Sequence, residues 1–177
     1  YKETYLIGLD RDKNISEHAL KLKKNYFDRF QFNNLKFSQI HKVKEFKNTD
    51  FFLFDLGVSN FQLKNMDRGF SFKSKSKLDM GMGLNTFNAC DLLEKVSEKN
   101  LKNILKFFGE EKFASQISKK IIEYRNNEKI ISGKDLSNII NSIKYNKGKT
   151  DPSTKSFQAI RMIVNQELSE IYQALEY

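Results

Sequence analysis

The first part of the chain alternates short apolar runs with amphipathic stretches. Residues 5–10 form a nearly continuous apolar run that ends in a carboxylate, which is typical of a buried parallel strand. Apolar positions in residues 15–26 then recur at spacings of four, three and four, which is the spacing of one helix face. Residues 30–32 predict a second short strand, and residues 50–55 predict a third that is again closed by a carboxylate.

This order of elements predicts an α/β fold, in which helices cover a parallel sheet. Asp10 and Asp55 end two of the predicted strands, and open parallel sheets bind ligands beyond the carboxyl ends of their strands. Asp10 can accept hydrogen bonds from ribose hydroxyls, or it can simply cap a turn. Asp55, followed by Gly57 and Ser59, can reach a cofactor or a reacting group, or it can form the turn that ends the strand.

The second half of the chain has a helical pattern. Residues 56–83 show little periodicity and predict a long loop, a feature that is often functional in compact domains. From there the apolar spacing predicts five helices, of which the last covers residues 157–175. Thr86, Ser97 and Ser132 are the predicted N-caps of the first, second and fourth of these helices.

The composition excludes several classes of protein. With 39% apolar and 30% charged residues among 177, the chain is neither a disordered tail nor a low-complexity polymer. One cysteine, Cys90, excludes an intramolecular disulfide, and two histidines exclude a zinc finger, so we expect no metal site. Cys90 falls in the apolar pattern of a helix, which predicts a packing role. No apolar run approaches the roughly 18 residues of a membrane span, and we expect a cytoplasmic protein without membrane contact.

The net charge of +9 leaves two interpretations open. A basic domain suits a nucleic-acid partner, whereas abundant Lys, Asn and Ile can also reflect an A+T-rich genome and a bland surface. In the predicted loop, Arg68, Lys73 and Lys75 interleave with Phe70 and Phe72. Such a mixture suits contact with RNA phosphates and stacking on bases. The alternative is that the two Phe side chains pack into the core beneath a solvated basic loop.

Six motifs occur in a fixed order along nearly the whole chain. They are GLDRD (8–12), DLGVSNFQL (55–63), DRGFSF (67–72), LDM (78–80), GEEKFA (109–114), and PSTKSFQAIR continued by VNQEL (152–161 and 164–168). Together they resemble the MraW/RsmH family, the S-adenosylmethionine-dependent methyltransferases that act on cytosine N4 in bacterial small-subunit ribosomal RNA (16S rRNA).

The resemblance implies an incomplete class I, Rossmann-like methyltransferase sheet with an all-helical insertion. Residues 1–83 would be a partial methyltransferase domain, residues 84–152 the insertion that helps to hold substrate, and residues 153–177 a helix returning to the first domain. The Gly-rich motif and the final strands of the family are not found in these 177 residues. The chain therefore resembles a central segment, and we expect that segment to be inactive alone.

The resemblance also implies roles for individual residues. S-adenosyl-L-methionine would be the cofactor, with Asp10 on its ribose and Phe37 near its adenine. Asp55 and Gln62 would line the side that faces the methionine group or the target base. An acceptor must hold the amino group of the cytosine in line with the methyl group. Asp55 is the candidate catalytic residue for this role, and the backbone of residues 57–59 is the alternative.

The implied partner is small-subunit ribosomal RNA, free or within a ribosomal particle. Two rival interpretations stay open. One is a catalytically inactive RNA-binding or interaction protein that retains the fold, and the other is a methyltransferase of the same family that acts on another nucleic acid.

Overall fold

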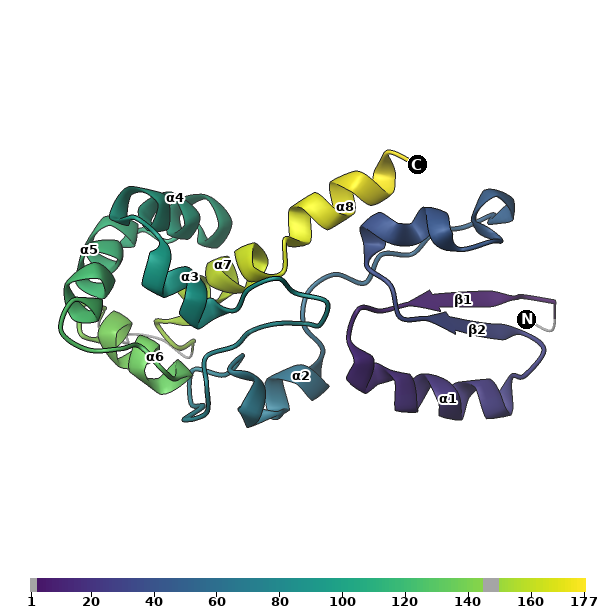
Figure 1. Ribbon diagram of the computed structural model, residues 1–177, viewed down its shortest axis with the longest axis horizontal. Coiled ribbons are helices and arrows are strands. Elements are labelled where there is room, and N and C mark those ends of the chain that lie inside the picture. Colours follow the sequence, from purple (N-terminus) through teal and green to yellow (C-terminus); the bar gives the residue numbers. More distant parts are fainter. Residues whose placement is uncertain (1–2, 145–149) are drawn as a thin grey trace. The chain divides into compact units, whose positions relative to one another are not determined.

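The chain folds as two compact units. The computed structural model describes residues 3–144 and 150–177 (Figure 1). The first unit comprises Tyr1–Leu56, Met82–Leu84 and Gln166–Tyr177, and the second comprises Gly57–Gly81 and Asn85–Asn165. Each unit is thus built from separate stretches of sequence. The sequence predicted three domains, at residues 1–83, 84–152 and 153–177, from the positions of motifs along the chain. The two units are defined by contacts in space, so the boundaries of the three domains stay a prediction.

A two-stranded parallel sheet with one helix forms the centre of the first unit. β1 (Leu6–Leu9) pairs with β2 (Phe30–Asn33), with Leu6 opposite Phe30 and Leu9 opposite Asn33. A short 3₁₀ helix, η1 (Lys13–Ile15), and α1 (Ser16–Asn25) connect the strands. The predicted strands at residues 5–10 and 30–32 and the connecting helix are confirmed, and with them the α/β character of the chain. The predicted burial of the first strand is wrong, because none of the residues of β1 is buried and Leu6 is 58% exposed. On the predicted apolar face of α1 only Ala19 is buried.

The predicted strand at residues 50–55 is wrong for this structure. Residues 51–56 have no regular secondary structure and no ladder partner within 3–144 and 150–177. A strand needs a neighbour for its backbone groups and cover on both faces, whereas Phe51 and Leu53 expose 78% and 82% of their surface. The alternation of an extended chain is nevertheless kept, because Phe52 and Phe54 contact Phe46 and Phe37 with ring centroids 5.7 Å apart.

Two 3₁₀ helices and a C-terminal helix complete the first unit. η2 (Phe37–Lys42) and η3 (Phe46–Asn48) follow β2, and α8 (Glu167–Leu175) packs against η2. The hydrophobic pattern did not predict the two short helices, since they bury no residue of their own.

The second unit is helical. Its elements are α2 (Asn60–Lys64), η4 (Met66–Arg68), α3 (Ala89–Lys95), α4 (Glu98–Gly109), α5 (Ala114–Arg125), α6 (Gly133–Asn141) and α7 (Thr154–Val164). α4 lies between α5 and α7, as Figure 1 shows. Apolar side chains at helical spacing fill the core, among them the fully buried Leu105, Ile121, Ile140 and Ile160.

Capping residues begin most of these helices. Ser97 and Ser132 cap α4 and α6 as predicted, each accepting a hydrogen bond from the backbone N–H three residues later. The predicted cap Thr86 is wrong, because α3 starts two residues further on. Asn88 caps it in a reciprocal box with Asp91, whose carboxylate accepts the backbone N–H of Asn88 at 3.1 Å.

The predicted last helix is two helices. α7 ends at Val164 and α8 begins at Glu167, with Gln166 in the left-handed conformation at φ 54°. The buried amide of Asn165 stabilises this break, since its Nδ2 donates to the carbonyl oxygens of Met80 (2.8 Å) and Arg161 (2.9 Å). The apolar spacing runs through the break, and for that reason the sequence predicted one continuous helix.

Within residues 3–144 and 150–177, no helix has both the length and the apolar character that crossing a membrane requires.

Candidate functional site at the carboxyl ends of the parallel strands

Asp10 lies directly beyond β1, where neighbouring backbone and side chains fix it. Its backbone N–H donates to the carbonyl of Asn33 (3.3 Å), which extends the pairing with β2. Its Oδ1 accepts the backbone N–H of Asp12 (2.7 Å), and the side-chain amide of Asn34 donates to its carbonyl oxygen (2.8 Å). The carboxylate therefore forms the turn and is held in a defined position. A turn-capping role and the predicted ribose-binding role are thus compatible for Asp10.

Phe37 follows β2 and opens η2. Its half-buried ring meets the ring of Phe54 edge-on, with centroids 5.7 Å apart and planes at 88°. Because β1 and β2 are parallel, the segments that carry Asp10 and Phe37 both leave the sheet at its carboxyl edge. The sheet thus gathers a carboxylate and an aromatic ring on one side of the first unit.

Asp55 is joined to this arrangement through its neighbour Phe54. The side chain of Asp55 is exposed at the end of the extended segment. The contact between Phe54 and Phe37 ties that segment to η2. Three of the predicted site residues, Asp10, Phe37 and Asp55, therefore belong to the first unit.

Gln62 belongs to the second unit and has a structural task there. It is 5% exposed and lies in the first turn of α2. Its Oε1 accepts the backbone N–H of Ser59 (2.9 Å), while Ser59 Oγ accepts the backbone N–H of Gln62 (3.2 Å). This reciprocal capping box fixes the DLGVSNFQL segment. The cofactor role of Gln62 stays a prediction beside it.

Two substitutions separate the capping role of Gln62 from the predicted cofactor role. Ser59→Ala is expected to lower the free energy of unfolding by about 1 kcal/mol, because the N–H of Gln62 loses its acceptor. Gln62→Glu keeps an acceptor for Ser59, but it brings a carboxylate to a side chain that is 5% exposed, so it should also lower the free energy of unfolding, by about 1–3 kcal/mol. Urea unfolding measures both. Weaker cofactor binding in Gln62→Glu than in the similarly destabilised Ser59→Ala would support the cofactor role, and equal binding in the two variants would contradict it.

The aromatic pair of the DRGFSF motif packs within the second unit. Phe70 is 6% exposed, and the ring of Phe72 meets that of Phe157 edge-on at 6.3 Å. Arg68 lies over Phe70, with its guanidinium carbon 5.4 Å from the ring centroid, and it donates to the carbonyl of Gly81 at 2.8 Å. The packing interpretation is thus confirmed for Phe70, whereas Phe72 packs against Phe157 and stays partly exposed.

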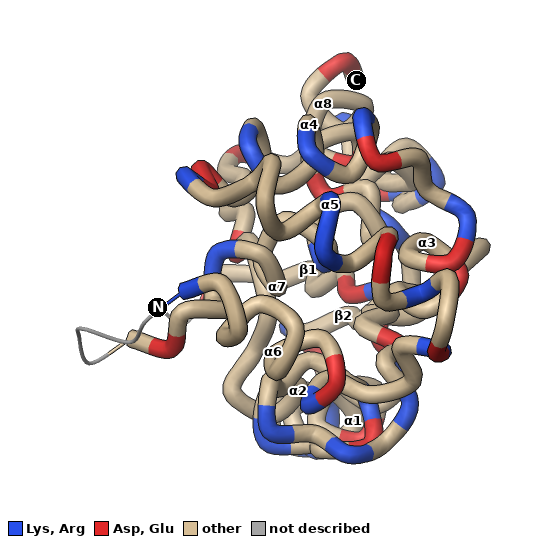
Figure 2. Tube along the Cα trace, turned by 90° about the vertical axis from the view of Figure 1, so that its left-hand side faces the viewer, with Lys and Arg blue, Asp and Glu red and all other residues tan. Residues whose placement is uncertain are grey.

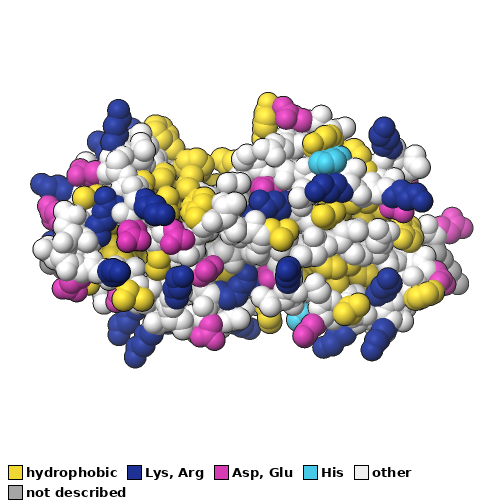
Figure 3. Space-filling model, in the orientation of Figure 1, with side chains coloured by type: hydrophobic (Ala, Val, Ile, Leu, Met, Phe, Trp, Pro, Cys, Tyr) yellow, Lys and Arg dark blue, Asp and Glu magenta, His cyan; other side chains and the backbone are white. Residues whose placement is uncertain are grey.

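Lys73 and Lys75 extend from the same segment and are exposed. They are consequently the better placed of the predicted RNA contacts, whereas Arg68 serves the fold of its own loop. Figure 2 shows Lys and Arg interspersed with Asp and Glu along the trace. In Figure 3 the basic side chains likewise spread over the visible face among acidic and apolar ones. On the face that Figure 3 shows, the positive charge therefore does not gather into a patch that would mark a nucleic-acid surface.

Cys90 has the packing role that the sequence predicted. Its Sγ donates to the carbonyl of Ile130 at 3.5 Å, and its side chain is half-buried. Burial raises the pKa of the Cys90 thiol, so the thiol stays neutral and poorly reactive near neutral pH.

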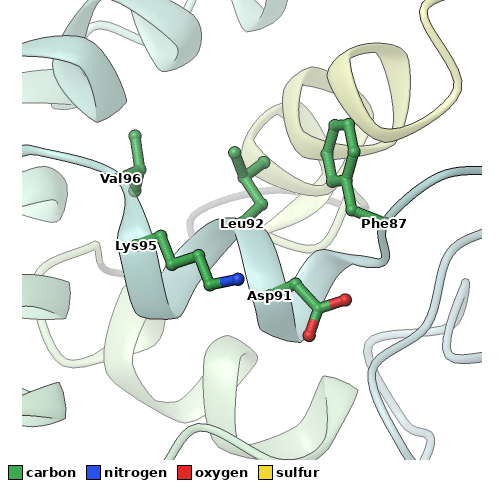
Figure 4. A pocket seen from close by; sticks show the side chains of 5 residues that line it. All are labelled: Phe87, Asp91, Leu92, Lys95 and Val96. Carbon is green, nitrogen blue, oxygen red and sulfur yellow. The ribbon is translucent and has the colours of Figure 1, made fainter.

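A shallow hollow on α3 is separate from the predicted residues. The side chains that line it are Phe87, Asp91, Leu92, Lys95 and Val96. In Figure 4 the three apolar side chains extend to the same side of α3. The hollow thus belongs to the surface of one short helix, and it contains none of the predicted site residues.

Sequence reasoning missed Glu170, a buried carboxylate in the first unit. It is 7% exposed, and its Oε2 accepts both the backbone N–H (3.1 Å) and the hydroxyl (2.6 Å) of Ser38. Burial opposes ionisation of Glu170, but these hydrogen bonds and the charge of Lys36 outweigh it and lower its pKa. The only local signal was a Glu on the buried face of an amphipathic helix, since its hydrogen-bond donor Ser38 lies 132 residues earlier.

A family model described as "MraW methylase family" matches residues 1–177. The chain is 44% identical over 169 residues to the Ribosomal RNA small subunit methyltransferase H of Rickettsia canadensis (strain McKiel), a match that covers 94% of this chain and 54% of that protein. It is 42% identical over 171 residues to the protein of the same name from Rickettsia akari (strain Hartford), with 96% and 56% covered.

The chain spans about half the length of the curated relatives that it matches. The family model nevertheless matches it from Tyr1 to Tyr177, and the six motifs are distributed over the same stretch. The chain belongs to the MraW methylase family.

Proposed function

We propose that the protein containing this chain transfers a methyl group from S-adenosylmethionine to cytosine N4 in small-subunit ribosomal RNA. The match of the family model to residues 1–177 carries the proposal. The names of the relatives support ribosomal RNA of the small subunit as the substrate. The base and the reacting atom come from the resemblance of the six motifs, as does the expected Rossmann-like sheet with a helical insertion.

The residues at the carboxyl edge of the sheet fit the adenosine half of the cofactor. A carboxylate suits the two ribose hydroxyls, and an aromatic ring suits adenine. Asp10 is held by its hydrogen bonds with Asp12 and Asn34. Phe37 is held by Phe54 and keeps part of its ring exposed. Both side chains are thus prepositioned before a ligand binds, which lowers the entropy cost of binding.

Asp55 is assigned the role of hydrogen-bond acceptor for the N4 amino group of the target cytosine. When bound, the cofactor supplies an electrophilic methyl group on a sulfonium. The N4 lone pair of cytosine is delocalised into the ring, so the amino group must be held in line for attack. A carboxylate can accept a hydrogen bond from that amino group and favour the positive charge that develops on the nitrogen.

The RNA must present its cytosine unstacked, because N4 is inaccessible to in-line attack within a stacked helix. The exposed side chains of Lys73 and Lys75 are assigned to phosphate contacts that hold the flanking strand. Arg68 is not needed for this role, since it is bonded to the backbone of its own unit.

A methyl-transfer assay tests the proposal. The purified gene product that contains this chain is incubated with methyl-tritiated S-adenosylmethionine and, separately, with small ribosomal subunits, free rRNA or DNA. Nuclease digestion should then give label in N4-methylcytidine from small-subunit rRNA. Label in DNA would favour the rival nucleic-acid substrate, and RNA binding without label would favour the inactive RNA-binding protein.

Asp10→Asn is the matched variant in this assay. It keeps an oxygen for the backbone N–H of Asp12 but removes the charge. A hydrogen bond to a charged group is worth about 1.5–3 kcal/mol, so cofactor binding should weaken about 10- to 100-fold. The fold, monitored by circular dichroism, should not change.

A further inference from the structure

α8 brings a buried carboxylate to the start of η2. Glu170 lies on this helix with 7% of its surface exposed. Besides the two hydrogen bonds that it accepts from Ser38, its Oε1 lies 3.4 Å from the ammonium nitrogen of Lys36. One side chain from the end of the chain therefore holds the two residues that flank Phe37.

These contacts act on the backbone that carries the Phe37 ring. The first N–H groups of a helical turn have no acceptor within the helix, and Glu170 supplies one for Ser38 from another element. Its negative charge is also favourable at the N-terminal end of a helical segment. From the other side, Phe54 fixes the ring edge-on. The direction of Phe37 is thus set by Glu170 on the backbone and by Phe54 on the ring.

Glu170 also acts electrostatically on Arg11, which lies in the loop beyond β1. Burial lowers the pKa of the Arg11 guanidinium, and the negative charges of Glu170, Glu167 and Asp10 partly offset this loss. Arg11 is anchored as well, because its Nε donates to the carbonyl of Gly83 at 2.6 Å. Glu170 therefore interacts with the segment after β2 directly and with the segment after β1 through the charge of Arg11.

Stability alone does not explain a carboxylate at this place. A buried ion pair is often no more stabilising than well-packed apolar side chains of similar volume. What an apolar side chain cannot supply is a directed acceptor for the N–H and hydroxyl of Ser38. The contribution specific to Glu170 is therefore the geometry of the η2 start, and with it the position of Phe37.

We propose that Glu170 is a positioning residue for the side chains proposed to bind the adenosine half of the cofactor (the adenosine half-site), because it holds Phe37 through Ser38. This inference rests on the proposed function, in which Phe37 and Asp10 contact the cofactor. Glu170 itself does not touch the reacting atoms.

The test uses Glu170→Gln in the gene product that contains this chain, with Glu176→Gln as the matched control. Glu176 is an exposed carboxylate near the end of the same helix. Glu170→Gln is expected to raise the KM for S-adenosylmethionine about 10-fold, which corresponds to the loss of one charged hydrogen bond. The kcat and the KM for RNA should stay within about twofold, and Glu176→Gln should match the wild type.

Ser38→Ala provides a second variant that does not introduce a new amide. Like Glu170→Gln, it should raise the KM for the cofactor. Combining the two variants should add little to the effect of either one, because both act on the same contact between Ser38 and Glu170. Additive effects of the two variants would contradict the proposal. If Glu170→Gln lowered both kcat and the midpoint of unfolding but left the KM for the cofactor unchanged, Glu170 would have only a structural role.

A readout without catalysis keeps this test separate from that of the proposed function. Calorimetry measures the Kd of S-adenosylhomocysteine, and ¹³C-phenylalanine NMR, with the Phe37 signals assigned by Phe37→Leu, reports the ring without ligand. We expect a weaker Kd and broadened or shifted Phe37 signals in Glu170→Gln. Unchanged Phe37 signals would overturn the positioning role, whereas an inactive wild type with the expected Phe37 changes would overturn only the proposed function.

Discussion

Methyl transfer by the protein that contains this chain is expected to fall at least about 100-fold when Asp55 is replaced by alanine. The proposed role of this carboxylate is to accept a hydrogen bond from the N4 amino group and to stabilise the charge that develops on it. Asp55 is exposed and follows Phe54, which is anchored on Phe37. Its removal should therefore act on the reaction and not on packing. Single-turnover rates with excess enzyme measure the effect directly.

Two further variants make the result specific to the reacting group. Asp55→Asn keeps an acceptor oxygen but removes the charge, so its rate should lie between those of Asp55→Ala and the wild type. Asp50→Ala removes the exposed carboxylate at the other end of the same extended segment and should leave the rate unchanged. If Asp55→Ala transferred methyl groups as fast as Asp50→Ala, the assignment of Asp55 would be wrong.

Replacing Glu111 by alanine is expected to lower the free energy of unfolding by about 3–5 kcal/mol, the cost of breaking a buried ion pair. Glu111 is 4% exposed, and its Oε2 lies 2.7 Å from the ammonium nitrogen of Lys144. Its Oε1 accepts the backbone N–H of Phe113 at 3.1 Å. The substitution leaves the charge of Lys144, whose side chain is 15% exposed, without this partner, which is the larger part of the expected loss. Urea unfolding measures it.

A double variant separates the loss of one partner from the worth of the pair. Glu111→Leu with Lys144→Met replaces both charges by apolar side chains of similar volume, and it should recover most of the stability that Glu111→Ala loses. Lys144 also donates to the carbonyl of Pro152 at 2.5 Å, so recovery should be incomplete. A single variant that lost less than about 1 kcal/mol would show that the pair is not buried in solution.

The elements that the sequence predicted well are those with a local cause. β1, β2 and the helices capped by Ser97 and Ser132 depend on an apolar pattern and on a capping side chain a few residues away. Residues 50–55 failed because a strand needs a partner that no local pattern contains. The break at Asn165 was missed for a similar reason, since the amide that stabilises it bonds to Met80, which is 85 residues away.

The residues of the candidate site divide in the same way, into those that a local pattern indicates and those that depend on distant partners. Asp10 was indicated by its position at a strand end and Phe37 only by the resemblance, and the parallel pairing explains why both leave the sheet at one edge. The sequence left open whether Phe70 packs into the core or stacks on bases, and only the folded chain decided for packing. Glu111 lies inside a quoted motif and Glu170 just beyond one, yet neither role was visible, because their partners lie 33 and 132 residues away.

The contact of Glu170 with Ser38 also sets an order of events during synthesis. A ribosome makes Phe37 and the start of η2 first, and the carboxylate that holds them follows 132 residues later. At about 5–20 residues per second this delay is roughly ten seconds. During that interval β1, α1 and β2 can form, whereas Phe37 has no support from α8. The nascent chain therefore completes the proposed adenosine half-site late, after the helices of the second unit have been made.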